Sequence, residues 1–445
     1  MWTIATQNDF LKFLNQYPQL QEYATDIILK KINNKIFLPK FTYYLYPSEY
    51  LQLFNDPEFN PIHIDIDFNK SLWPEQQQII LPFIQQYSVS NTMTGTLKAR
   101  PGAGKTVMGI YLATILKYKT LIMLNNTALT QQWIDAVLNF TTCTEDDIGL
   151  IQGNTFNVEN KKIIIGMVQT FCSRVQKEDV SEFYDKIKQI GIGFCLFDEC
   201  HHSISGPKYA LSSLLINTTN IVGLSATPYH VGLQEFLMTG TVGNILSDTK
   251  NYDIKPKVNI VKFNSYIDQK IVNSIYKVGD MLKQRAKYNA VIADSERYMN
   301  LLLALNNELL TNGHRIINIV FTKKQVQKIS DYLSLHNIDN IQFYSEQREL
   351  NKTTDKCLVA TYKFAGEGFD YKELSALIIA TPLSGKKSLI QVIGRILRSC
   401  NDKKSPEVYI LVDKRIGNVF TKDISRITKI IKDEFQVDSE IIDLN

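Results

Sequence analysis

Six residues near the middle of the chain, Phe197 to His202, combine two carboxylates, a thiol and two imidazoles. Cys195 lies just upstream, so the local sequence reads CLFDECHH. Such residues serve two kinds of chemistry. Thiolates and imidazoles bind zinc when four of them converge, whereas an acidic pair that ends an apolar strand can hold Mg²⁺ beside a nucleotide. The spacing alone leaves both interpretations open.

A second stretch, LKARPGAGKT, has the residues needed to bind phosphate. A strand-like run precedes it and a helix-compatible run follows. The glycines allow a tight turn whose amides point at phosphate oxygens, and the helix N-terminus adds partial positive charge. We expect Lys105 to reach the β- and γ-phosphates and the Thr106 hydroxyl to ligate Mg²⁺. The residues predicted to bind nucleotide here are Arg100, Pro101, Gly102, Ala103, Gly104, Lys105 and Thr106.

A phosphate loop requires a second strand with an acidic end, and CLFDECHH provides one. Its apolar run delivers Asp198 to the edge of the sheet, where it is expected to hold Mg²⁺ through water. Glu199 is then placed to orient the attacking water. A zinc site would need convergent N and S ligands, and the chain has no second cysteine pair to supply them. We therefore predict Mg²⁺, with Lys105, Asp198 and Glu199 catalytic and His201 coupling.

Near the end of the chain, QVIGRILRS places a glutamine and two arginines at spacings typical of one helical face. These residues are Gln391, Arg395 and Arg398. The planar guanidinium fork pairs well with phosphate oxygens, which makes both arginines candidates for the γ-phosphate. The alternative is a charged surface that serves solubility.

Short apolar runs that could position these residues alternate with helix-like stretches along most of the chain. The runs are 94–99, 120–125, 162–168, 193–199, 220–227, 315–322, 356–361, 375–382 and 408–413. Runs of Ile, Leu and Val that are nearly continuous predict strands buried in parallel sheets, and the alternation predicts βαβ units. We expect an α/β fold of two lobes with a cleft between them. The predicted domains are a small α+β module at 1–65, a first lobe at 66–245 and a second at 246–445.

The composition fits a soluble protein of several domains, because 445 residues exceed one compact domain. No apolar run approaches the roughly 20 residues that cross a bilayer, and the N-terminus has no secretory signal pattern. The six cysteines lack CxxC pairs, which favours reduced thiols in the cytoplasm. We expect no membrane association and a monomer.

The net charge of +4 says little about partners, but two local stretches are basic and rich in aromatic residues. They are residues 30–50 and 250–290. Either could neutralise phosphates and stack bases, or could be a solvated face whose aromatic residues belong to the core. In the first stretch, the candidate nucleic-acid contacts are Lys35, Lys40, Phe41 and Tyr43.

Taken together, the motifs ARPGAGKT, DECH, SAT, YKFAGEGFD and QVIGRILR occur in an order that resembles the superfamily 2 helicases, over about residues 70–413. That family normally opens its first motif with Ala, as Ala99 does here. Within it, the chain looks most like phage branch-migrating DNA helicases of the UvsW type, and next like poxvirus transcript-release helicases. The resemblance implies two tandem RecA-like lobes, ATP with Mg²⁺, and DNA as the partner.

The resemblance also implies a role for each motif. Gln76 would read adenine, Ser225 and Thr227 would couple hydrolysis to lobe movement, and Arg395 and Arg398 would act as arginine fingers. The residues implied to bridge nucleotide and DNA in the second lobe are Gly366, Glu367, Gly368 and Asp370. Those implied to contact nucleic acid are Thr127, Gln169, Thr170, Thr322 and Thr361.

Three functions remain in competition. The first is an ATP-dependent DNA helicase or translocase that unwinds or branch-migrates forked or junction DNA in replication, recombination or repair. The second is a nucleic-acid-dependent ATPase that remodels RNA or transcription complexes without processive unwinding. The third, a metabolic P-loop kinase or GTPase, is disfavoured by the segment from Gln391 to Arg398. Residue types alone do not separate DNA from RNA.

Overall fold

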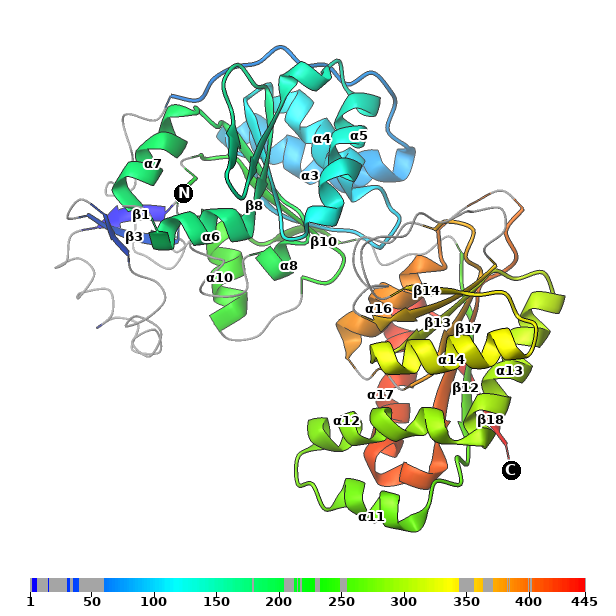
Figure 1. Ribbon diagram of the computed structural model, residues 1–445. Helices are drawn as coiled ribbons and strands as arrows, with labels where there is room; N and C mark the ends of the chain where they lie inside the picture. The colour runs from blue at the N-terminus through cyan, green and yellow to red at the C-terminus, as the bar shows by residue number, and fades with distance from the viewer. Residues whose placement is uncertain are drawn as a thin grey trace. The chain divides into compact units, whose positions relative to one another are not determined.

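The computed structural model describes most of the chain as two compact units. The described residues are 2–5, 15, 30–32, 35–39, 60–177, 180–203, 212–213, 215–216, 218–228, 233–248, 254–343, 356–362, 371–381, 383, 385–398, 400 and 402–444. The first unit comprises residues 1–99 and 103–249, and the second comprises residues 250–445 with loop residues 100–102. Each unit has helices packed around its own largely or wholly parallel sheet (Figure 1).

The main sheet of the first unit has eight strands in the order β11-β4-β10-β9-β5-β8-β6-β7. All neighbouring pairs are parallel except the edge pair of β6 and β7. The strands are β4 (Thr94–Lys98), β5 (Thr120–Leu124), β6 (Ile148–Gln152), β7 (Thr155–Asn157), β8 (Ile163–Met167), β9 (Phe194–Phe197), β10 (Ile221–Ser225) and β11 (Ile245–Asp248).

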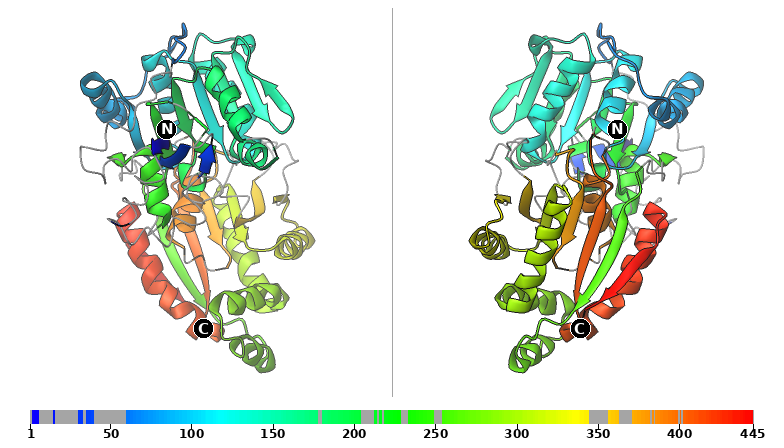
Figure 2. Two further views of the ribbon diagram at one scale, coloured as in Figure 1. Left: turned by 90° about the vertical axis from the view of Figure 1, so that its left-hand side faces the viewer. Right: turned by 90° about the vertical axis from the view of Figure 1, so that its right-hand side faces the viewer.

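Helices pack on both faces of this sheet, as the views from two sides in Figure 2 also show. The α-helices of the unit are α3 (Pro74–Ser90), α4 (Lys105–Leu116), α5 (Thr130–Phe140), α6 (Val168–Lys177), α7 (Val180–Gln189), α8 (Cys200–Ser203) and α10 (Leu233–Val242). Two 3₁₀ turns, η4 (Thr127–Leu129) and η5 (Glu145–Asp147), complete it. The apolar runs of the sequence are thus explained by strands covered on both sides.

Alternating residues of each central strand supply two separate hydrophobic layers. On β5, Ile122 and Leu124 join the layer beneath α3, α4 and α5, whereas Leu121 and Met123 join the layer beneath α6, α7 and α10. This is the two-residue period of a strand, with both faces apolar. The carboxyl ends of the strands are thereby held at fixed positions between two packed layers.

The chain before α3 is already hydrogen-bonded to the main body of the first unit. Backbone N–H groups of Ile62, Ile64 and Asn69 donate to carbonyls of Gly191, Lys117 and Phe140. Further upstream, β1 (Trp2–Ala5), β2 (Lys30–Ile32) and β3 (Lys35–Pro39) form an antiparallel sheet in the order β1-β3-β2. Whether residues 1–65 act as a separate module stays a prediction.

The second unit is built on a seven-stranded parallel sheet in the order β14-β15-β13-β16-β17-β12-β18. Its strands are β12 (Lys257–Phe263), β13 (Ile316–Val320), β14 (Ile341–Phe343), β15 (Cys357–Thr361), β16 (Ala376–Ile379), β17 (Glu407–Asp413) and β18 (Ser439–Asp443). Its helices are α11 (Gln269–Tyr276), α12 (Met281–Val291), η6 (Ile292–Asp294), α13 (Glu296–Thr311), α14 (Lys323–Leu335), α16 (Lys386–Arg395), η7 (Lys414–Ile416) and α17 (Gly417–Phe435). The two sheets, the first mostly and the second wholly parallel, confirm the predicted α/β fold of two lobes.

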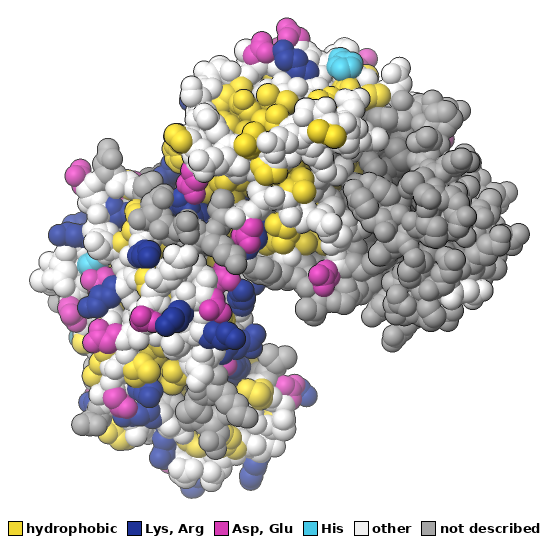
Figure 3. Space-filling model, turned by 180° about the vertical axis from the view of Figure 1, so that it is seen from behind, with side chains coloured by type: hydrophobic (Ala, Val, Ile, Leu, Met, Phe, Trp, Pro, Cys, Tyr) yellow, Lys and Arg dark blue, Asp and Glu magenta, His cyan; other side chains and the backbone are white. Residues whose placement is uncertain are grey.

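The basic stretch 250–290 contributes to the core as well as to the surface of this unit. Phe263 and Tyr288 are buried in its hydrophobic cluster, while Tyr266 is 65% exposed. Lys and Arg side chains, with Asp and Glu among them, gather over the second unit on the face seen in Figure 3. Among the helices that the structure describes, none is long and apolar enough to cross a membrane.

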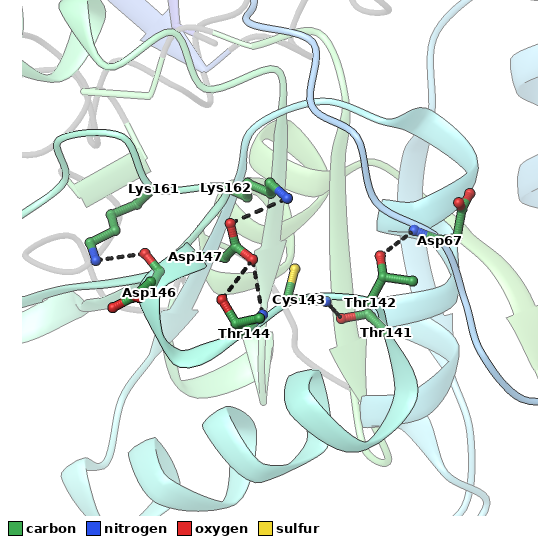
Figure 4. A network of polar contacts seen from close by, with 9 residues as sticks. All are labelled: Asp67, Thr141, Thr142, Cys143, Thr144, Asp146, Asp147, Lys161 and Lys162. Carbon is green, nitrogen blue, oxygen red and sulfur yellow. Dashed lines mark hydrogen bonds and ion pairs between the residues drawn. The ribbon is translucent and has the colours of Figure 1, made fainter.

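A polar network fixes the start of β6 in the first unit (Figure 4). The Asp147 carboxylate accepts the Thr144 backbone N–H at 2.9 Å and lies 3.2 Å from Lys162 Nζ. The Thr144 hydroxyl adds a contact of 3.1 Å to the same carboxylate. The Thr144 N–H, followed by Lys162, holds the pKa of Asp147 below its ordinary value. This box caps η5, which leads directly into the strand.

Candidate functional site

Five neighbouring parallel strands of the first unit end at one edge of the sheet, and each leads into residues singled out in the sequence. The strands are β4, β10, β9, β5 and β8. The residues at or after their ends are, in that order, Ala99 to Lys105, Ser225 to Thr227, Asp198 with Glu199, Thr127, and Gln169 with Thr170. Because parallel strands end on the same side, these candidates lie along one edge of the sheet.

The loop after β4 has the conformation expected of a phosphate loop. Gly102 and Gly104 are both left-handed, with φ of 85° and 82°. A Cβ on Gly104 would require the Gln76 amide, the end of a flexible side chain, to shift, so the left-handed φ is the main reason that this position needs glycine. Helix α4 begins at the next residue, Lys105, and receives no side-chain cap from Gly104. Its first N–H groups therefore suit an anion such as a phosphate.

Gln76 connects the start of α3 to this loop. Its side chain is 4% exposed, and Nε2 donates to the Ala103 carbonyl at 3.1 Å. Its Oε1 accepts the backbone N–H of Trp73, also at 3.1 Å, which closes the first turn of the helix ahead of Pro74. Gln76 therefore links the first turn of α3 to the phosphate loop. Its adenine-reading role stays a prediction.

The acidic pair at the end of β9 is asymmetric. Asp198 is 8% exposed, and its Oδ2 accepts the indole N–H of Trp133 at 2.9 Å. Its Oδ1 accepts the backbone N–H of Glu199, also at 2.9 Å. Burial, followed by the charge of Glu199, raises the pKa of Asp198 to about 6. A buried carboxylate with so raised a pKa gains from a cation, and its oxygens and that of Thr106 are ligands that Mg²⁺ prefers.

Glu199 has a backbone conformation that is unusual for a residue other than glycine. Its φ is 43°, in the left-handed region that costs a non-glycine residue about 1 kcal/mol or more. Such strain concentrates at functional sites. The conformation starts the tight turn between β9 and α8, so that Asp198 and Glu199 follow the strand directly.

Three residues from two motifs form one buried hydrogen-bonded chain. His201 and Ser225 are fully buried, and His201 Nδ1 lies 2.7 Å from Ser225 Oγ. The same hydroxyl accepts the Thr227 backbone N–H at 3.0 Å. His201 Nδ1 is also 3.3 Å from a carboxylate oxygen of Glu199. The structure thus brings together the residues proposed to couple hydrolysis to movement.

The thiols of CLFDECHH lie in the core. Cys195 and Cys200 belong to the apolar layer beneath α6, α7 and α10. Burial raises the pKa of both thiols above their ordinary value. Both residues pack as small apolar groups in this layer.

The segments expected to follow nucleic acid lie at the ends of β5 and β8. Thr127 is exposed at the start of η4, and the Asn126 side chain accepts the N–H of the next residue, Ala128. Gln169 Nε2 donates to the Asn125 carbonyl and so ties the two segments together. Thr170 is 8% exposed, and its hydroxyl accepts the Gly153 N–H at 2.9 Å.

In the second unit, two residues implied to contact nucleic acid lie at one edge of the sheet. Thr361 ends β15 and is in register with Val320 at the end of β13. Thr322 follows β13 and caps α14, where its hydroxyl accepts the Gln325 N–H at 3.1 Å. Gln391 and Arg395 lie in α16, and Gln391 is 7% exposed.

One expectation for this region was wrong. Gln391, Arg395 and Arg398 were expected on one helical face, but α16 ends at Arg395, and Arg398 lies in the turn that follows. Gly394, one residue before the end, weakens the helix there. Only Gln391 and Arg395 share the helix.

Several candidates lie outside what the structure describes. These are Gly366, Glu367, Gly368, Asp370, Lys40, Phe41 and Tyr43, together with the side chain of Lys35, whose backbone is in β3. Their roles stay predictions.

Two residues near the candidates carry contacts that sequence reasoning missed. Trp133 bonds Asp198, as described above, and Lys403 Nζ donates to the backbone oxygens of Arg398 and Lys372 at 2.7 and 2.9 Å. Trp133 stands in the run ALTQQW, where a tryptophan on a helix face usually indicates core packing. Lys403 lies among lysines, and neither pattern signals a specific partner.

Two family models match the chain, one in each unit. Residues 69–230 match the family described as "Type III restriction enzyme, res subunit", and residues 299–400 match "Helicase conserved C-terminal domain". Together the two matches cover more than half of the chain. They enclose the phosphate loop, the acidic pair and the segment from Gln391 to Arg398.

Viral and phage proteins are among the similar sequences. "Putative ATP-dependent RNA helicase L396" of Acanthamoeba polyphaga mimivirus is 25% identical over 78% of this chain and 65% of its own length. "Probable helicase D10" of Escherichia phage T5 is 20% identical over 78% of this chain and 73% of its own length. An African swine fever virus protein, "Putative ATP-dependent RNA helicase QP509L", is 23% identical over 71% and 64%. The chain thus spans less than two thirds of the mimivirus relative.

A solved structure shares the fold of the described residues. Saccharomyces cerevisiae Dbp5, bound to RNA and ADP BeF3, superposes with a TM-score of 0.55 at 15% identity, over 84% of this chain and 94% of that one. At this identity the likeness concerns the fold.

Proposed function

Since the chain is a superfamily 2 helicase by its two family matches, we propose that it is an ATP-driven motor that moves along or remodels nucleic acid. The observation that carries this proposal is that a phosphate loop, an acidic pair and the segments after β5 and β8 follow strands that end at one edge of the first sheet. We propose that the segments after β5 and β8 are the ones that track nucleic acid. A kinase or GTPase would not require the tracking segments.

In the proposed mechanism, the first N–H groups of α4 and the Lys105 ammonium hold the phosphates. Asp198 and Thr106 would hold Mg²⁺, which supplies charge neutralisation on the phosphates when bound. Glu199 orients the attacking water. Arg395 and Arg398 of the second unit are proposed as arginine fingers, with Gln391 beside them.

The link from hydrolysis to movement is assigned to the buried chain of His201, Ser225 and Thr227. A change at the Glu199 carboxylate reaches His201 across 3.3 Å, and from there Ser225 across 2.7 Å. His201, Ser225 and Thr227 are buried. If one of them moves, the lost hydrogen bond must be replaced by a neighbouring protein group rather than by bulk water. A shift at one end therefore moves the segment after β10.

DNA is the first proposed partner, as forked, branched or single-stranded DNA, because the motif set resembles phage branch-migrating helicases. RNA is the second, and the names of the mimivirus and African swine fever virus relatives support it. The phage T5 relative is named a helicase without a stated nucleic acid. The relatives with these names come from viruses and a phage. We propose a viral or phage motor that acts in the host cytoplasm, in recombination or repair if it moves on DNA and in transcript remodelling if it moves on RNA.

The test is ATP turnover without nucleic acid, and with single-stranded DNA, forked DNA and RNA of matched length. Greatest stimulation by forked DNA supports the first candidate, and greatest stimulation by RNA supports the second. Displacement of a strand from a tailed duplex then separates a motor from a clamp that only binds and releases. Equal turnover in all four conditions would contradict both candidates.

A further inference from the structure

Trp133 makes a contact that the roles assigned so far do not use. Its ring is 1% exposed, and its indole N–H donates to Asp198 Oδ2 at 2.9 Å. The indole ring has one hydrogen-bond donor and no acceptor, so this bond satisfies the only polar group of the side chain. Asp198 Oδ1 meanwhile accepts the Glu199 N–H. The plane of the carboxylate is therefore fixed by one bond on each oxygen.

The position of Trp133 in the fold connects this bond to an exposed segment of the chain. It lies in the first turn of α5, and α5 follows η4 without a break. The start of η4 is held by Asn126, whose side chain accepts the Ala128 N–H at 3.0 Å, and the residue before it by the Gln169 amide. Thr127 and Ala128 are exposed. A short hydrogen-bonded path thus runs from an exposed segment, through one helical turn, to a buried carboxylate.

We infer that Trp133 is a positioning residue that transmits nucleic-acid contact at Thr127 and Ala128 to the Asp198 carboxylate. This inference rests on the proposed function, in which the exposed segment follows nucleic acid and Asp198 holds Mg²⁺. A helix turn is stiff, so a displacement of η4 moves the indole with it. The indole then draws Asp198 Oδ2 toward or away from the metal-holding orientation.

The neutral character of the donor suits this task. An arginine or lysine at the same place would pair with the carboxylate and compete with a divalent cation. An indole N–H orients the Asp198 oxygen without neutralising the charge of the carboxylate, which stays available to a divalent cation. Partners that orient a metal-holding carboxylate typically change metal affinity by about 10-fold or more when they are removed.

The alternative is that Trp133 only fills the core, because it also belongs to the apolar layer beneath α3, α4 and α5. Trp133→Phe separates the two explanations, since it keeps an aromatic ring and removes the N–H. Phe83→Leu is the matched control. Phe83 is fully buried in the same layer, and its side chain has no polar atom that could bond the acidic pair.

The experiment measures two quantities on the full chain. The first is the Mg²⁺ concentration that half-saturates binding of a fluorescent ADP analogue, which needs no turnover. The second is the ratio of ATP turnover with and without nucleic acid. Trp133→Phe is expected to raise the half-saturating Mg²⁺ by about 10-fold and to lower the stimulation ratio by a similar factor. Phe83→Leu is expected to change neither by more than about 2-fold at a temperature where both variants are folded.

A spectroscopic reading of the unmodified chain keeps the inference testable if the variant does not fold. The chain has three tryptophans, and Trp73 is 60% exposed. The indole N–H of Trp133 should exchange slowly with solvent, and its ¹⁵N–¹H signal should shift when nucleic acid is added without nucleotide. A signal that does not move, or a variant with unchanged Mg²⁺ requirement and ratio, would overturn the inference. If the unmodified chain hydrolyses no ATP with any nucleic acid, the proposed function fails instead.

Discussion

Ser225→Ala removes the hydroxyl at the centre of the buried chain that joins the acidic pair to the end of β10. The hydroxyl lies 2.7 Å from His201 Nδ1 and accepts the Thr227 N–H at 3.0 Å. The substitution deprives two buried groups of a hydrogen-bond partner, and one such loss costs about 1–3 kcal/mol. We therefore expect the local stability around β10 to fall by about 2 kcal/mol or more. That is roughly a 30-fold change in the local opening equilibrium.

Amide hydrogen exchange measures this change where it occurs. Protection of the Thr227 amide and of the β10 amides should fall by roughly 30-fold, while amides of β17 in the second unit should keep theirs. Ser90→Ala is the control, because Ser90 is exposed on α3 and its hydroxyl donates to the Gln86 carbonyl. An exposed change of this kind stays within about 0.5 kcal/mol.

The same variant tests the proposed coupling role. If Ser225 connects hydrolysis to movement, strand displacement per ATP hydrolysed should fall while nucleotide binding is kept. Unchanged exchange at Thr227 would refute the energetic reasoning. An equal loss of turnover and of displacement, with normal exchange elsewhere, would refute the coupling role and leave Ser225 as a structural residue.

Three further predictions concern separate parts of the molecule. Gly104→Ala should weaken ATP binding by about 10-fold, because it adds about 1–2 kcal/mol of strain to the phosphate loop and displaces the Gln76 amide, and a nucleotide-binding titration checks it. Asp147→Ala should lower stability by about 1 kcal/mol, against no measurable change for the exposed Asp146→Ala. Because the folded pKa of Asp147 is lowered, this stabilisation is present above the ordinary aspartate pKa and is lost as pH falls through the folded value, so denaturation midpoints of wild type and variant should converge in acid. Arg398→Ala should reduce kcat by about 10³-fold or more with ATP affinity nearly unchanged, and single-turnover kinetics distinguish the two.

Much of the sheet architecture could be predicted because its strands are apolar on both faces. The runs at 120–125, 162–168, 193–199 and 220–227 became β5, β8, β9 and β10 within two residues at each end. β12, KVNIVKF, was overlooked because lysines at 257 and 262 placed it inside a basic stretch, although four of its residues in a row are buried. Short edge strands such as β7 and β14, of three residues each, carry too little pattern to detect.

In the candidate site, local sequence chemistry was predictable, whereas contacts between distant parts of the chain were not. Residues fixed by local chemistry, such as Gly104 before a helix and Asp198 at the end of a strand, could be placed from the sequence. The bond from Trp133 to Asp198 joins residues 65 apart in the chain, and only the packing of α5 on the sheet creates it. The end of α16 before Arg398 was missed because periodicity continues past the residue where the helix stops.

The most direct test of the central claim is ATP turnover by the purified chain with saturating nucleic acid, compared with turnover by Glu199→Gln and Lys105→Ala under identical conditions. The account predicts strong stimulation of the unmodified chain by nucleic acid. It also predicts that stimulation is lost in both variants, with ATP still bound by Glu199→Gln. Turnover that is indifferent to nucleic acid, or that survives in Glu199→Gln, would contradict the account.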